Sequence, residues 1–219
     1  MPAADTLLVF TVTALALILV PGPGLLLLLA SGVAYGRRTA VFSSLGLETG
    51  TAVYVAATAT GLSALLASST LAFSIVRYLG AAYLVVLGVR TLIGRTRSTI
   101  GDPPSQPTSQ HTPPDPLPCQ AYRQALLVGI TNPKIALFFV ALFPQFIEPH
   151  RGAAAGQVLV LGAVFVTLAL AVDLLVATTA GALGRWLARR PSFARRQRYV
   201  TGPIYLVLGA AAAGDPSGH

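Results

Sequence analysis

The sequence carries little charge and almost no cysteine. Charged residues make up only 10% of its 219 residues, whereas a soluble globular domain carries roughly 25%. The single cysteine, Cys119, excludes an internal disulfide and a carrier that needs paired thiols. No histidine lies within an apolar run and no nucleotide-binding P-loop is present. We therefore expect no metal site, no cofactor and no enzyme activity.

Long apolar runs dominate the sequence. Hydrophobic residues make up 54% of the chain, and the mean hydropathy is +0.70. The runs do not alternate as the strands of a membrane barrel do, and a spanning helix needs about 20 apolar residues. Six segments can be marked, at 6–34, 39–67, 70–93, 121–147, 156–183 and 199–213. We predict an all-α integral membrane protein of about six transmembrane helices.

A proline-rich segment at residues 94–120 divides the chain in two. Its prolines alternate with Ser, Thr and Gln, a composition that cannot form a packed core. We therefore expect a first three-helix unit at 1–93, a cytoplasmic linker at 94–120 and a second three-helix unit at 121–219.

The net charge of +8 is concentrated in the connections after the first, third and fifth apolar segments. Basic loops of this kind stay on the cytoplasmic side of a membrane. This placement differs from a basic groove interleaved with aromatic residues, so we expect no nucleic-acid partner. Both chain termini are predicted to face outward.

The two units share a sequence pattern. Residues 77–88 and 198–209 both begin Arg-Tyr, contain Gly-x-x-Tyr-Leu and end Val-Leu-Gly. Chance similarity between two helices rich in Leu, Val and Gly is the alternative. If the repeat is real, the odd number of helices in each half forces the halves into opposite orientations, as in many secondary transporters.

Two apolar segments contain prolines at matching places, in the first helix of each half. The residues are Pro21, Gly22, Pro23 and Gly24 in the first segment, and Asn132, Pro133 and Lys134 in the fourth. A proline removes a backbone donor and frees the carbonyl four residues before it. We expect both helices to break within the membrane, with Thr131 and Asn132 as caps of the second half-helix.

Matched breaks are typical of a transporter's binding site, and we predict that these seven residues bind substrate. The amides after Pro23 and Pro133 suit a carboxylate. The carbonyls freed before each break, such as that of Leu17, suit an ammonium group. Two packed kinks without any ligand are the alternative interpretation.

Three ionisable residues lie within apolar runs, where a charge is costly unless it is paired or hydrated. Lys134 has a substrate or gating role, or it pairs with a nearby carbonyl. Glu48 and Asp173 bind a proton or a substrate ammonium, or they form a structural ion pair. Gly46 and Gly50 match the small-residue pattern by which membrane helices pack closely.

These motifs together resemble the LysE/RhtB family of amino-acid exporters. The resemblance runs from about residue 5 to residue 210 and spares the proline-rich linker. It rests on Pro21-Gly22-Pro23, Gly46-x-x-x-Gly50, Gly-Ala-Ala-Tyr-Leu in the third segment, Asn132-Pro133-Lys134, and Leu142-Phe143-Pro144-Gln145-Phe146. Many members have an acid directly after the second glycine of the Gly-x-x-x-Gly motif, where this chain has Thr51.

The resemblance implies a multi-pass protein of the bacterial cytoplasmic (inner) membrane that exports amino acids by proton antiport. The partners implied are a zwitterionic substrate, protons and membrane lipid, and a homo-oligomer stays open. The alternatives are an exporter of another small solute or cation and, in a different class, a membrane scaffold without transport activity.

Overall fold

The computed structural model describes residues 2–68 and 116–188, together with isolated helical positions between 78 and 89 and between 203 and 210. Within this part the chain is helical and contains no strand, which confirms the all-α prediction. The apolar segments at 70–93 and 199–213 lie almost entirely outside the described residues. The repeat that they carry therefore stays a prediction.

The first apolar segment is broken where its prolines predict. Helix α1 covers Ala4–Leu19 and helix α2 covers Pro23–Ser68, with a non-helical stretch from Val20 to Gly22 between them. Pro23 opens α2, a position where the missing N–H costs nothing because the first amides of a helix have no partner within it.

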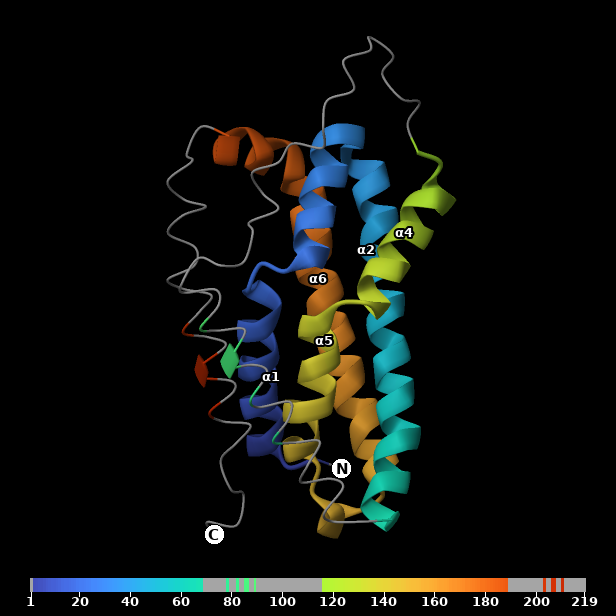
Figure 1. Cartoon of the computed structure of the whole chain (residues 1–219), viewed down its shortest axis with the longest axis vertical. Helices are drawn as coiled ribbons and strands as arrows, with labels where there is room; N and C mark the ends of the chain where they lie inside the picture. The colour runs from blue at the N-terminus through green and yellow to red at the C-terminus, as the bar shows by residue number, and fades with distance from the viewer. Residues whose placement is uncertain are drawn as a thin grey trace.

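Helix α2 reverses its direction at Gly36, so it holds the end of the first apolar segment and the whole of the second. Gly36 departs from helical geometry with a φ of +81°, which a residue without a Cβ adopts readily. Figure 1 shows the two arms of α2 rising and returning side by side. The exposed Arg37 and Arg38 follow the turn directly.

The fourth apolar segment is also broken. Helix α4 covers Pro118–Ile130 and begins three residues inside the segment expected as linker, because Gln120 accepts a hydrogen bond from the Leu117 N–H and caps the first turn. Helix α5 covers Pro133–Leu137 and continues as a π-helix, η1 (Phe138–Leu142), and a 3₁₀-helix, η2 (Phe143–Phe146). The parts before and after the break are bent by 41°.

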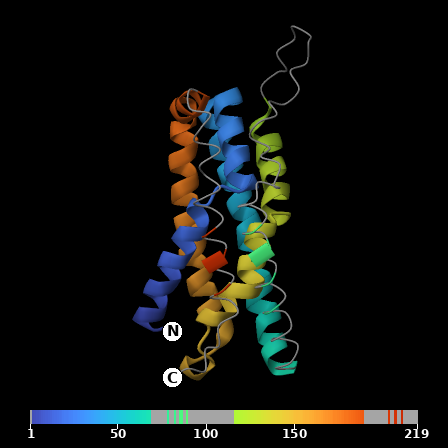
Figure 2. The same cartoon turned by 60° about the vertical axis from the view of Figure 1, so that its left-hand side comes forward.

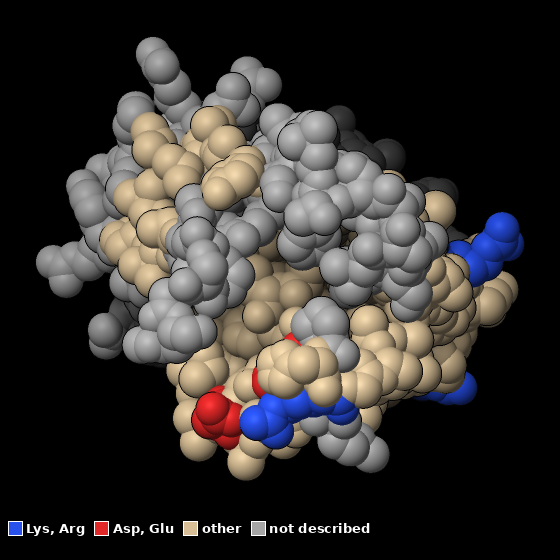
Figure 3. Space-filling model, turned by 90° about the horizontal axis from the view of Figure 1, so that it is seen from below, with Lys and Arg blue, Asp and Glu red and all other residues tan. Residues whose placement is uncertain are grey.

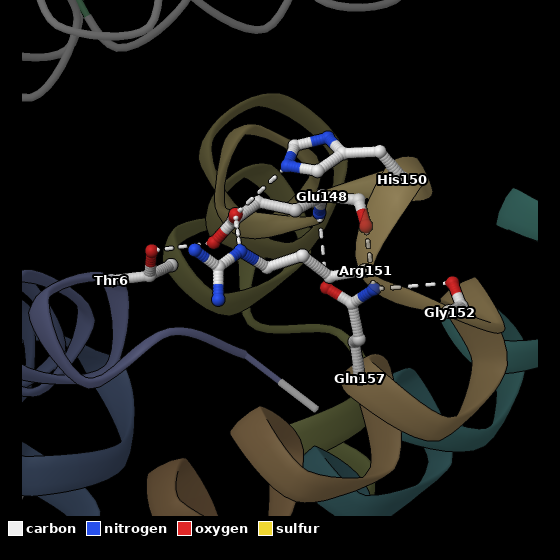
Figure 4. Close-up of polar contacts among 6 residues, drawn as sticks. All are labelled: Thr6, Glu148, His150, Arg151, Gly152 and Gln157. Carbon is white, nitrogen blue, oxygen red and sulfur yellow. Dashed lines mark hydrogen bonds and ion pairs between the residues drawn. The ribbon is translucent and has the colours of Figure 1, made fainter.

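A short turn with the 3₁₀-helix η3 (Pro149–Arg151) leads into α6 (Ala154–Ala188). Glu148 organises this turn: its carboxylate accepts a 2.6 Å hydrogen bond from Thr6 of α1 and pairs with Arg151 at 2.7 Å. The buried side chain of Gln157 on α6 accepts a hydrogen bond from the Glu148 N–H and donates one to the Glu148 carbonyl oxygen (Figure 4). The bond from Thr6, and then the charge of Arg151, lower the pKa of Glu148 below its usual value.

A cluster of aromatic side chains fills the space between α1, η1, η2 and α6. Its fully buried members are Phe10, Phe138, Phe139, Phe143 and Phe165. Phe10 meets Phe143 edge to face with the ring centroids 5.4 Å apart, a favoured geometry for aromatic pairs. Figures 1 and 2 show α1 beside the lower part of α6, and α4 beside α2, in agreement with the contacts between these helices.

By length and composition, two described helical stretches are apolar enough to cross a membrane: Pro23–Gly61, which turns back at Gly36, and Ala154–Ala180. The bent pair from Pro118 to Phe146 makes a third if it forms one span. These helices support the membrane class. The expected total of six includes segments outside the described residues and stays a prediction.

Helices α2 and α4 approach so closely that only glycine fits between them. A Cβ built on Gly50 would lie 2.9 Å from Gly129, and one on Gly129 would lie 2.7 Å from the carbonyl oxygen of Leu47. A Cβ on Gly46 would collide with the carbonyl oxygen of Tyr122. The small-residue packing predicted for Gly46 and Gly50 is therefore confirmed.

We expect Gly46→Ala to destabilise the protein, because overpacking a close helix contact costs about 1–3 kcal/mol. Gly61→Ala is the matched control, since no described atom lies within 4 Å of a Cβ at that position and alanine is the better helix former. Thermal unfolding of the purified variants in detergent measures both effects. Equal melting temperatures for the two variants would contradict the close packing of α2 on α4.

Candidate functional site

The structure brings the two helix breaks together. A Cβ built on Gly22 would lie 3.5 Å from the side chain of Lys134, and one on Gly24 would lie 3.8 Å from Asn132 Nδ2. Residues more than 100 positions apart in the chain are thus in contact, at the point where each helix is interrupted. This is the arrangement that matched breaks predict.

Lys134 connects the second break to the first. Its ammonium donates hydrogen bonds to the carbonyl oxygens of Leu17 (3.1 Å) and Val20 (2.9 Å) in the last turn of α1 and directly after it. The side chain is only 6% exposed, and a buried cation requires such polar partners. The carbonyl that we expected to receive a substrate ammonium, that of Leu17, is therefore bonded to an ammonium of the protein itself.

Asn132 fixes the start of α5. Its side-chain oxygen accepts a 3.1 Å hydrogen bond from the Lys134 N–H, as an N-cap residue does. Thr131 ends α4 instead, and its hydroxyl bonds the carbonyl of Leu127 within the same helix. Of the two predicted caps, Asn132 is thus confirmed, and it places Lys134 in the first turn of α5.

A small cavity of about 40 Å³ lies between the breaks. Among the predicted site residues, Gly24, Asn132, Lys134, Glu48 and Asp173 line it. The other lining residues are Ile18, Leu25, Leu47, Thr51, Gly129, Ile135, Phe165 and Ala169. Pro21, Gly22, Pro23 and Pro133 are not among the lining residues; they shape the backbone around the cavity.

Glu48 and Asp173 reach the cavity from α2 and α6, and each is 8% exposed. Both side chains line the same cavity as Lys134, near enough for the three charges to influence one another. Glu48 Oε2 has no hydrogen-bond partner among the described residues. Two buried acids face one ammonium, so the cluster is one positive charge short of neutral when all three are ionised, and a proton or a cation would balance it.

The N-terminus of α2 contributes hydrogen-bond donors and partial positive charge to the cavity, in contrast to the acids. Gly24 and Leu25 line the cavity just after Pro23, and the first amides of a helix lack partners within it and carry partial positive charge. The cavity therefore has donor groups at one place and carboxylates at another, which is the pattern that a zwitterion needs.

The cavity is small for a ligand pocket. Ligand pockets usually measure about 300–1,000 Å³, and this cavity is several times smaller. It has room for a few water molecules but not for a solute the size of an amino acid.

Little in the sequence indicates that two further residues, Thr51 and Phe165, line the cavity. Thr51 lies three residues after Glu48, which places both on one face of α2, so helical phase could have identified it. Phe165 belongs to a continuous apolar run of α6, and its type is common in any core.

The chain is similar to known membrane proteins over most of its length. The sequence profile of a family described as "LysE type translocator" matches residues 15–214. An uncharacterized membrane protein of Vibrio cholerae is 34% identical over 94% of this chain and 95% of its own length. A homoserine/homoserine lactone efflux protein of Salmonella typhimurium is 31% identical over 93% and 94%, respectively. No solved structure matches the chain.

We expect Asn132→Ala to lower the stability of the protein, because removing an N-cap costs about 1 kcal/mol. Thr131→Val is the control: it is the neighbouring residue, its side chain is exposed, and its hydroxyl bonds only within α4. The measurement is the melting temperature in detergent. A loss as large for Thr131→Val as for Asn132→Ala would show that the cap does not support the break.

Proposed function

We propose that this chain, which belongs to the LysE type translocator family, exports amino acids or related small zwitterions from the bacterial cytoplasm. Membership makes the chain a membrane transporter of small solutes and not an enzyme. The Salmonella relative, named for the efflux of homoserine and homoserine lactone, supports a solute of amino-acid size.

The observation that carries the proposal is the cavity between the two helix breaks, with carboxylates and a helix N-terminus on its walls. The substrate carboxylate binds the amides of Gly24 and Leu25, where the dipole of α2 favours negative charge. The substrate ammonium binds Glu48 and Asp173. The predicted binding residues have two roles in this proposal. Gly24, Asn132 and Lys134 line the site, while Pro21, Gly22, Pro23 and Pro133 interrupt the helices around it.

Proton antiport follows from the charge of the same cluster. Glu48 and Asp173 attract either a proton or the ammonium of the substrate, and binding of one cation weakens the attraction for the other. Substrate released outside is replaced by a proton, which the cytoplasmic substrate later displaces. The two buried acids thus couple the opposite movements of proton and substrate.

Alternating access requires the closed cavity to open to each side in turn. Breaks in α1–α2 and α4–α5 are natural hinges, because the main chain there lacks continuous helical hydrogen bonds. Rocking of one three-helix half against the other would expose the cavity first to the cytoplasm and then to the outside.

The proposed location is the cytoplasmic (inner) membrane, with both termini outside. The exposed Arg37 and Arg38 lie at the Gly36 turn, away from the start of α1, and basic residues stay on the cytoplasmic side. Seen from the end where α1 begins, the described surface shows few charged side chains, most of them gathered near one edge (Figure 3).

Efflux from cells loaded with a panel of labelled amino acids tests the transport proposal. We expect an uncoupler to abolish efflux, and Glu48→Gln or Asp173→Asn to reduce it at least about tenfold, equivalent to about 1.4 kcal/mol. Asp5→Asn is the control, because it neutralises an acid in the exposed first turn of α1. Efflux that ignored the uncoupler would refute proton coupling and leave facilitated export, and wild-type efflux by both site variants would refute the assigned site.

Reporter fusions test the orientation. A reporter that is active only in the cytoplasm should be active when inserted at Gly101 and inactive at Gly152, because an odd number of spans separates the two positions in the proposed topology. Activity at both positions, or at neither, would contradict the inverted arrangement of the two halves.

A further inference from the structure

The ammonium of Lys134 is bonded to two main-chain oxygens and shares its cavity with two carboxyl groups. The main-chain oxygens are those of Leu17 and Val20 at the break after α1, at 3.1 and 2.9 Å. The carboxyl groups of Glu48 on α2 and Asp173 on α6 line the same cavity and bring negative charge near the ammonium.

Oxygen atoms in this combination are ligands for a monovalent cation. Carbonyls of unwound membrane helices coordinate small cations in transporters, and carboxylates add the negative charge that offsets the loss of hydration. Here the positive charge comes from a side chain of the protein, so the cation is covalently attached to α5.

Within the described part of the chain, the ammonium of Lys134 leaves one buried oxygen of the same cavity without a hydrogen bond. A lysine ammonium has three N–H donors, and the carbonyls of Leu17 and Val20 take two of them. Glu48 Oε2, on a side chain that is 8% exposed, has no hydrogen-bond partner among the described residues. The surroundings of Lys134 therefore remain attractive to positive charge.

We propose that the carbonyls of Leu17 and Val20, with the acids Glu48 and Asp173 in the same cavity, form a monovalent-cation site that the ammonium of Lys134 occupies. The folded protein then needs no cation from solution at this position. Replacing Lys134 by an uncharged side chain converts it into a site for a small diffusible cation. The inference concerns the folded protein and holds whichever solute is carried.

The test compares the thermal unfolding of purified wild-type protein and Lys134→Met in detergent, with the chloride salts of methylammonium, sodium, potassium and choline at equal ionic strength. The wild type should melt at one temperature in all four salts. Lys134→Met should melt lower in choline and recover, with saturation, in methylammonium or sodium.

The two recovering salts distinguish the chemistry of the site. Methylammonium donates N–H hydrogen bonds as Lys134 does, whereas sodium requires direct coordination by oxygen. Choline has no N–H group and is too large for the space that a lysine ammonium fills. Identical melting of Lys134→Met in all four salts would overturn the proposal.

Arg123→Met is the matched control, because it removes a positive charge from an exposed position on α4; its melting temperature should not depend on the cation.

Adding Glu48→Gln to Lys134→Met should weaken the recovery by removing one carboxylate. If Lys134→Met is too unstable to purify, the level of protein in membranes is measured instead. The double variant should then accumulate to a higher level than Lys134→Met, because it loses one negative and one positive charge from the cavity.

Equal membrane levels of the single and double variants would then overturn the proposal. Since neither measurement involves efflux, a negative result here leaves the transport proposal intact. Absence of amino-acid efflux, in turn, leaves the cation site intact.

Discussion

The bond between the Lys134 ammonium and the carbonyls of Leu17 and Val20 is the interaction on which the centre of this structure depends. A broken helix in apolar surroundings leaves main-chain groups without partners, and each unsatisfied group is costly there. The second break supplies a cation to the oxygens of the first. Two local defects therefore stabilise each other, and the space between them becomes the cavity.

Close packing of the helices then determines which side chains share that cavity. The contact of Gly46 and Gly50 with α4 brings α2 near the second break, and Glu48 lies between these two glycines. Helix α6 adds Asp173 from the other side. At the end where α1 begins, the aromatic cluster around Phe10 and the hydrogen bonds of Glu148 join α1 to the second half of the chain.

Much of the candidate site could be predicted, because the residues that indicate each helix break are neighbours in the sequence. Proline within an apolar helical run, as at positions 21, 23 and 133, interrupts that run, and Asn132 before a proline is a favourable cap. The partner of the freed Leu17 carbonyl was not predictable in this way. A substrate ammonium and the ammonium of Lys134 are chemically equivalent, and 117 residues separate the lysine from that carbonyl.

The sequence by itself determined the membrane class, the helical structure and both breaks, since each follows from composition or from neighbouring residues. Only the tertiary structure decided that Lys134, Glu48 and Asp173 line one cavity, and that Thr51 and Phe165 line it with them. The physical reason is that these residues come from three helices. Their distances depend on helix packing, which the local pattern of apolar residues does not specify.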